Sequence, residues 1–233
     1  MIIIPSRLAS TRFPRKALAD IHGKPAIQRV YEGCGDNEIY VATPDEELAE
    51  VVEGFGGKCV MTGEHSTVLG RCAEASRILE PEVVVVVQGD EPLVNPRMLE
   101  LALSGLQESF VSTLIKELEP DEDPADPNMV KVVIDHYGYI MYATRAVVPG
   151  HTPEKHGTFS PPFYKQSCIM AFAPPMLEAY DNWEQLVLEK SEGIDIVRFL
   201  YYGNAVKAVI SPYDTQALDT EEDLERIRKL WTT

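Results

Sequence analysis

The sequence predicts an α/β fold with a doubly wound sheet, and two features of its first half carry that prediction. Strand-like and helix-like stretches alternate from residue 2 to residue 87, and repeated units of this length wind right-handed around a parallel sheet. Val83–Val87 is an uninterrupted run of five valines, which is typical of a central parallel strand with both faces buried. The 233 residues suffice for one large domain or two small ones.

Apolar runs and helix-start signals predict the elements of the first half in order. The expected strands are Ile2–Ile4, Ile39–Thr43, Lys58–Met61 and Val83–Val87. The expected helices are Pro25–Gly33, a helix that begins at the sequence Pro44-Asp45-Glu46-Glu47, and Val68–Leu79. Proline is favoured in the first helical turn and acids are favoured near a helix N-terminus, so both signals mark helix starts.

The second half has more strand character. The expected strands are Val111–Ile115, Val130–Ile134, Tyr139–Ala143, Ile169–Ala173 and Val206–Ile210. The second and third of these form a hairpin across residues 135–138. Residues 117–128 are an acidic, proline-rich connection, and residues 148–163 predict a long loop. Acids follow Thr220 and basic residues precede Leu230, so Thr220–Leu230 is expected to be a closing helix whose charges complement its dipole.

Composition and charge exclude several classes of protein. The chain is 45% hydrophobic and 25% charged, as in an ordinary globular enzyme. Its formal net charge of −16 argues against a nucleic-acid partner, which requires many phosphate-neutralising cations. No run of about 18 apolar residues exists, so we expect no membrane span, and the apolar N-terminus predicts a core strand rather than a signal peptide. The four cysteines form no C-x-x-C pair, which predicts free thiols in a reducing cytoplasm.

The N-terminal segment has the opposite charge to the rest of the chain. The first thirty residues contain six Lys or Arg and one acid. After the first strand, residues 6–18 offer cations, hydroxyls and backbone N–H groups, which together suit a strongly anionic small ligand such as a phosphate. A solvated basic loop is the alternative, and spacing alone does not separate the two interpretations.

Two aspartates are candidates for a metal site. Asp90 follows the valine strand through Gln88-Gly89, and open α/β sheets bind ligands outside the carboxyl ends of their strands. A carboxylate there could hold Mg²⁺ beside phosphate oxygens, or it could cap a turn. Asp219 directly precedes the last helix, where spacing alone favours a helix cap over a metal ligand.

Five segments in one order resemble a known family. They are the opening run, Gln88–Pro92, Asn128–Val133, Tyr142–Ala146 and the tail that begins at Asp219. Together they resemble the 3-deoxy-manno-octulosonate cytidylyltransferase family over essentially the whole chain. The resemblance implies one nucleotidyltransferase-type, Rossmann-like domain with a mixed sheet over residues 1–233. Residues 1–110 and 205–233 would bind the nucleotide, and a β-rich excursion within residues 111–204 would bind the acceptor and form a homodimer.

The resemblance also implies a reaction and roles for individual residues. CTP and an acid would give a CMP-linked product and pyrophosphate, with Mg²⁺ required. Nucleotide-binding residues would be Arg7, Ser10, Arg12, Lys16, Arg71 and Gln88. Asp90 and Asp219 would hold the metal, and Arg145 would meet the anionic group of the acceptor. Catalysis would depend on Arg12, Lys16 and Asp90, because an in-line attack on the α-phosphorus requires positioning and charge neutralisation.

The chain departs from the family pattern in two places on the nucleotide side. Arg15 stands where the family has glycine, which predicts a changed loop shape because a residue with a Cβ rarely adopts a positive φ. Val68-Leu69-Gly70-Arg71 replaces the family's Gly-Thr-Glu-Arg. We therefore keep open a transferase of the same architecture that uses another nucleotide, and a nucleotide-binding protein without catalysis.

The acceptor side departs further. Gln166 stands in place of a histidine, Met170 in place of a tyrosine and Ile196 in place of an amide. A pocket with fewer hydrogen-bonding partners predicts a less hydroxylated acceptor, such as a compact phosphonate like phosphonoformate. Lys165, and also Lys155 and His156, could add cations near Arg145. The family's own 2-keto sugar acid is the alternative acceptor.

Overall fold

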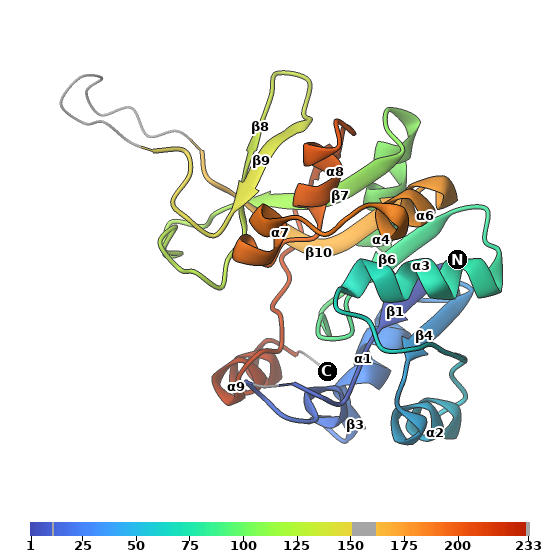
Figure 1. The fold of residues 1–233 in the computed structure, drawn as a ribbon. Coiled ribbons are helices and arrows are strands. Elements are labelled where there is room, and N and C mark those ends of the chain that lie inside the picture. Colours follow the sequence, from blue (N-terminus) through green and yellow to red (C-terminus); the bar gives the residue numbers. More distant parts are fainter. Residues whose placement is uncertain (11, 151–161, 232–233) are drawn as a thin grey trace.

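The computed structural model describes residues 1–10, 12–150 and 162–231 and has an α/β fold with one large mixed sheet (Figure 1). Its main path runs in the order β11-β7-β10-β6-β1-β4-β5, and β8 pairs with β10 and β9. The strands are β1 (Ile2–Pro5), β4 (Ile39–Thr43), β5 (Cys59–Met61), β6 (Val84–Val87), β7 (Val111–Glu117), β8 (Lys131–Ile134), β9 (Ile140–Thr144), β10 (Tyr164–Phe172) and β11 (Lys207–Ile210). A small separate sheet pairs β2 (Asp20–Ile21) with β3 (Lys24–Pro25).

Helices cover both faces of the large sheet. They are α1 (Ala26–Gly33), α2 (Glu46–Gly54), α3 (Val68–Leu79), α4 (Pro96–Ser104), α6 (Pro174–Asn182), α7 (Val187–Glu192), α8 (Ile196–Tyr201) and α9 (Glu221–Leu230), with short 3₁₀ turns η1 (Lys16–Leu18) and η2 (Gly105–Gln107). Side chains of β1 alternate between two cores: Ile3 packs with α3, α6 and α8, whereas Ile2 and Ile4 pack with α1, α2 and α4. This alternation is the doubly wound arrangement that the sequence predicts.

Most predicted elements of the first half are confirmed within a residue or two. The strand Ile39–Thr43 and the helix Val68–Leu79 have the predicted bounds. Thr67 caps α3 by accepting a hydrogen bond from the backbone N–H of Gly70, so the helix start is encoded locally. Helices α4, α6, α7 and α8 were not predicted. Helices α7 and α8 are only six residues long, whereas α4 does carry a local start signal, the N-cap Asn95 followed by Pro96.

The valine strand β6 is buried along its whole length, as predicted. It pairs in parallel with β1 on one side, but β10 runs antiparallel to it on the other. The strand is central, as predicted, but only one of its two neighbours is parallel to it. A strand buried on both faces has the same apolar pattern whichever direction its neighbour takes, so the sequence could not distinguish the two pairings.

The predicted hairpin of β8 and β9 is confirmed, and it projects from the large sheet in Figure 1. Strand β10 begins at Tyr164, five residues before the predicted start, and its register against β7 shifts between Gln166 and Met170. Because β10 runs antiparallel to β6, its N-terminal half lies at the edge where β6 ends. That edge carries the candidate site. In the described part of the chain, no helix is long and apolar enough to cross a membrane.

Candidate active site

A cavity of about 550 Å³ lies at the carboxyl ends of β1 and β6. Its walls come from the loop after β1, the turn after β6, the start of α3, the connection before β8, the N-terminal half of β10 and the segment 193–196. Most residues with a predicted role line it: Arg7, Ser10, Arg12, Lys16, Arg71, Gln88, Asp90, Arg145, Gln166 and Asp219. The fold thus brings together side chains that are more than two hundred positions apart in the sequence.

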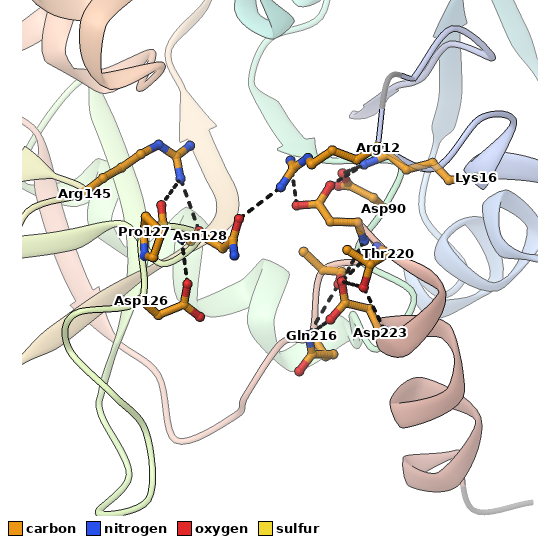
Figure 2. A network of polar contacts seen from close by, with 12 residues as sticks. Arg12, Lys16, Asp90, Asp126, Pro127, Asn128, Arg145, Gln216, Thr220 and Asp223 are labelled. Atoms are coloured by element: carbon orange, nitrogen blue, oxygen red, sulfur yellow. Dashed lines mark hydrogen bonds and ion pairs between the residues drawn. The ribbon is translucent and has the colours of Figure 1, made fainter.

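Lys16 contacts both candidate metal ligands, and Figure 2 shows it beside Asp90. Its Nζ is 2.5 Å from Oδ2 of Asp90 and 2.8 Å from Oδ1 of Asp219. Arg12 makes an ion pair of 2.9 Å with Oδ2 of Asp219 and donates a hydrogen bond of 3.1 Å to Asn128. The basic loop therefore faces the crevice at the end of β6, where the Lys16 side chain is 19% exposed, whereas the Arg12 side chain is 55% exposed.

The turn after β6 presents Asp90 through a close contact with β1. A Cβ on Gly89 would lie 2.9 Å from the Cβ of Ser6, so glycine lets the two strand ends approach. Oδ2 of Asp90 accepts a hydrogen bond from Nζ of Lys16. The buried Oδ1 of Asp90 has no hydrogen-bond partner among the described residues. A buried carboxylate oxygen without a donor is costly, and a cationic ligand would satisfy it.

Asp219 is placed by its neighbour rather than by a capping role of its own. Thr220 is the N-cap of α9 and forms a reciprocal capping box with Asp223. The backbone N–H of Leu218 donates a hydrogen bond of 2.8 Å to the carbonyl of Asp90. The spacing-based interpretation of Asp219 as the cap is therefore wrong, because Thr220 does that work and leaves the Asp219 carboxylate to face Lys16.

Charges in this cluster change the pKa of Lys16 itself and of the neighbouring Glu91. Burial alone would lower the pKa of Lys16, but the carboxylates of Asp90 and Asp219 outweigh it and raise the pKa, so the ammonium stays charged. Glu91 is 2% exposed, and burial together with the Asp90 charge raises its pKa to about 8. Glu91 was not assigned a role from the sequence, because nothing local marks a glutamate as buried.

The backbone conformation of Arg15 differs from the one that the sequence predicts. Arg15 adopts φ 60° and ψ 26°, in the left-handed region, where an L-residue costs about 1–2 kcal/mol relative to glycine. Its guanidinium pairs with Glu47 on α2. The loop thus has a left-handed residue directly before Lys16 even though the residue is arginine, and the prediction that the substitution prevents a positive φ is wrong.

At the end of the cavity near α3, Arg71 is held rigidly. It is 4% exposed, and its Nη1 donates to Oγ1 of Thr62 at 2.6 Å and to the carbonyl of Gly63 at 3.1 Å. A Cβ on Gly70 would lie 2.9 Å from Oγ1 of Thr67, so the glycine at this departure from the family pattern sits against the N-cap of α3.

At the opposite end, Arg145 is fixed by backbone carbonyls. Its Nε donates to the carbonyl of Glu192 at 2.7 Å, and its Nη1 donates to the carbonyls of Pro127 and Asn128 at 2.9 and 3.2 Å (Figure 2). Its Nη2 makes no hydrogen bond to the described residues. The guanidinium is thus oriented without a direct ion pair to a described carboxylate, which suits the binding of an anionic group.

The acceptor-side prediction for Lys165 is not supported by its position. Its Nζ pairs with Glu122 at 2.5 Å and with Asp214 at 2.8 Å, and the side chain is buried outside the lining of the cavity. We therefore correct the prediction and remove Lys165 from the acceptor-binding set. Two acids placed by distant segments neutralise it, which sequence spacing could not reveal. Lys155 and His156 lie outside the described residues.

The remaining lining near Arg145 combines apolar residues with the polar Asn128 and Asp195. Val130, Met170, Ile194 and Ile196 border this end of the cavity. The amide nitrogen of Gln166 donates to Oγ1 of Thr113 at 3.2 Å, so the amide is oriented by β7. Among the described residues, no group of three or more histidine, cysteine, aspartate or glutamate side chains could hold a metal ion. Any divalent ion would rely on Asp90, Asp219 and ligand oxygens.

A basic loop and two aspartates at the carboxyl edge of a mixed α/β sheet define the class of nucleotidyltransferases. Comparison with known proteins gives the family: a model described as cytidylyltransferase matches residues 1–210. This chain belongs to that family, and it is a CTP-dependent nucleotidyltransferase.

Individual relatives match over nearly the full length. The chain is 38% identical to 3-deoxy-manno-octulosonate cytidylyltransferase of Aliivibrio salmonicida, covering 98% of this chain and 97% of the relative. It is 39% identical to the enzyme of the same name from Syntrophobacter fumaroxidans, covering 97% and 94%. A solved structure of CMP:2-keto-3-deoxy-manno-octonic acid synthetase complexed with CTP superposes with a TM-score of 0.89 at 32% identity, covering 98% and 96%.

Proposed function

We propose that this protein transfers the cytidylyl group of CTP to a compact anionic acceptor in a magnesium-dependent reaction. An acceptor oxygen bonds to the α-phosphorus, the bond from that phosphorus to the β-phosphate oxygen breaks, and pyrophosphate leaves. One observation carries the proposal: Lys16 and Arg12 meet Asp90 and Asp219 in one cavity. The cations would hold the triphosphate in line and neutralise charge as it moves to the leaving group.

The donor set fits a magnesium ion. Carboxylate oxygens are the ligands that Mg²⁺ prefers, and one or two of them with substrate phosphates are a common set. The unpartnered Oδ1 of Asp90 supports this assignment. Asp90 and Asp219 would hold the ion, which when bound neutralises charge on the reacting phosphate. The residues of the chain supply the rest: Lys16 and Arg12 bind the phosphates, and Arg71 bounds the nucleobase end.

The lining of the acceptor end favours a compact acid. Arg145 offers an oriented cation, whereas Val130, Met170 and Ile196 offer no hydrogen-bonding groups to a row of hydroxyls. A site that lacks partners for buried hydroxyls disfavours a polyhydroxylated ligand by several-fold or more for each group. A phosphonate such as phosphonoformate meets these demands. The names of the relatives support a second candidate, the 2-keto sugar acid 3-deoxy-manno-octulosonate.

We also propose one domain of residues 1–233, with the nucleotide bound by 1–110 and 205–233 and the acceptor by 111–204. A homodimer would form through the β8–β9 hairpin, where Tyr137 and Met141 are exposed. Light scattering tests this point: we expect twice the monomer mass, and a monomer for Met141→Asp. The four cysteines are free thiols, which supports the prediction of a reducing cytoplasm.

Pyrophosphate release tests the transfer. With CTP, Mg²⁺ and a panel that contains phosphonoformate and 3-deoxy-manno-octulosonate, we expect release with at least one acid. Asp90→Asn should lower that rate about 100-fold, because it removes the negative charge with which Asp90 would hold the metal ion and pair with Lys16. Asp36→Asn, an exposed substitution far from the cavity, is the matched control. Nucleotide binding without turnover of any acid would instead support a non-catalytic protein.

A further inference from the structure

Glu192, the last residue of α7, makes an unusual number of contacts with the end of β9. Its Oε1 accepts hydrogen bonds from Oγ1 of Thr144 at 2.8 Å and from the hydroxyl of Tyr142 at 3.4 Å. Its Oε2 accepts from the backbone N–H of Arg145 at 2.9 Å, and its carbonyl accepts from Nε of Arg145 at 2.7 Å. The carboxylate and the backbone carbonyl of Glu192 therefore both accept hydrogen bonds from Arg145.

Glu192 joins two walls of the cavity without lining it. Arg145 lies on one wall, and the segment 193–196, which follows Glu192 directly, lies on another. Gly193 adopts φ 63° at the C-terminus of α7, so the chain turns sharply there into the cavity wall. Glu192 thus connects the wall that carries Arg145 with the segment that carries Ile194, Asp195 and Ile196.

The opposite side of the arginine is held independently. The fully buried ammonium of Lys131 donates to the carbonyls of Asp126, Met129 and Arg145 at 2.7, 2.8 and 2.7 Å. These bonds fix the short connection whose Pro127 and Asn128 carbonyls receive Nη1 of Arg145. The guanidinium itself is held by the carbonyls of Pro127, Asn128 and Glu192. The Glu192 carboxylate acts on its direction through the backbone N–H of Arg145 and through Thr144.

The contacts also keep Glu192 ionised. Burial alone would raise its pKa, but hydrogen bonds from the N–H of Arg145 and from Thr144 and Tyr142 outweigh burial and lower the pKa. Oε2 of Glu192 faces a backbone N–H and Oε1 faces two hydroxyls, so a neutral amide could keep both contacts by donating to a hydroxyl, and it would lose mainly the negative charge.

We propose that Glu192 is the positioning residue for acceptor binding, because it directs the guanidinium of Arg145 into the cavity. The inference rests on the proposed function, in which Arg145 binds the anionic group of the acceptor. Glu192 itself does not touch the substrate. Its loss should weaken acceptor binding and leave the nucleotide end, formed by other elements, unchanged.

Steady-state kinetics with phosphonoformate and with 3-deoxy-manno-octulosonate test the inference, on whichever acid is turned over. For Glu192→Ala we expect the KM for the acceptor to rise tenfold or more, while the Kd for CTP, measured by calorimetry, changes less than twofold. Glu192→Gln keeps one acceptor oxygen and should lie between. Glu178→Ala, an exposed helical glutamate outside the cavity lining, is the control.

Arg145→Met separates failure of the inference from failure of the proposed function. If Arg145→Met leaves the KM for the acceptor unchanged, or if wild type turns over neither acid, the proposed acceptor site is wrong and the inference with it. If Arg145→Met raises KM but neither Glu192 variant does, the positioning role alone is overturned. A parallel rise in acceptor KM and CTP Kd would indicate general structural damage and also overturns it. Thermal unfolding of each variant identifies a folding defect.

Discussion

At the scale of single residues, one lysine lies between two acids that are far apart in the sequence. Asp90 and Asp219 are 16% and 25% exposed as side chains, and Lys16 between them is 19% exposed. Two carboxylates this close repel each other unless a cation lies between them. That cation is the ammonium of Lys16, and it lies between the two carboxylates that we propose as metal ligands.

Replacement of this lysine tests that arrangement directly. Lys16→Met should lower the rate of pyrophosphate release about 100-fold, because the variant lacks the ammonium group that would bind the triphosphate. The same change should tighten binding of Mn²⁺ in the absence of nucleotide at least fivefold, because the two carboxylates lose their competing cation. Electron paramagnetic resonance of free Mn²⁺ measures this affinity. Lys24→Met, which removes an exposed pair with Glu32, is the control, and equal Mn²⁺ affinity in all three proteins would contradict the prediction.

Because the carboxyl group of Asp195 is buried, we expect the free energy of unfolding to depend on pH. Burial raises the pKa of its carboxyl to about 6, above its value in the unfolded chain. Between about pH 4 and pH 6 the folded protein retains a proton that the unfolded chain has lost, so the free energy of unfolding falls as the pH rises and levels off above this window. The expected contribution is on the order of 1–3 kcal/mol. Urea unfolding of wild type and Asp195→Asn at pH 4.5 and 6.5 should differ in this way, and parallel curves would refute it.

At the scale of elements, helix ends encoded by adjacent residues are the features that sequence reasoning places well. The capping box of Thr220 and Asp223 fixes the start of α9, and α9 packs through Leu224 and Ile227 against Ile21 of the small sheet. Elements whose existence depends on a distant partner were missed. Helices α7 and α8 are joined by a buried ion pair of Glu189 and Arg198 at 2.6 Å, and neither helix has a strong local signal.

The cap of α9 should matter for both stability and activity. Thr220→Ala removes one capping bond and should lower the free energy of unfolding by about 1 kcal/mol, which corresponds to a fall in Tm of about 2–4 °C. Because Asp219 precedes the cap, the same variant should also slow pyrophosphate release. Thr220→Ser keeps the hydroxyl and should restore both values. Calorimetry and the release assay measure them, and an unchanged Tm for the alanine variant would exclude the capping role.

At the scale of the whole molecule, the cavity lies where the first-half sheet meets segments from the second half. Residues that line it come from β10, from the connection before β8 and from the turn before α9, as well as from the loop after β1. A ligand that bridges these segments stabilises the folded state, because the unfolded chain cannot bind it. Ligand binding should therefore raise the temperature at which the whole chain unfolds.

Thermal shift compares the nucleotides on this basis. CTP with Mg²⁺ at about 100 times its Kd should stabilise the fold by about 2.7 kcal/mol, a rise in Tm of about 5–10 °C for a chain of this size. UTP and GTP at the same concentration should give smaller shifts. A larger shift with either of them would contradict cytidine selectivity, and the Arg15 and Gly70 departures would then be the first positions to revert.

Much of the framework was determined by the sequence alone, because apolar periods, helix caps and turn residues act within one or two helical turns. The family motifs additionally pointed to Arg12, Lys16, Asp90 and Asp219 as one site. Only the tertiary structure decided how charged groups are paired. It neutralised Lys165 with Glu122 and Asp214, gave Asp219 to Lys16 rather than to a helix cap, and set β10 antiparallel to the valine strand. These outcomes depend on residues dozens of positions apart, whose proximity is a property of the packed fold and not of any local segment.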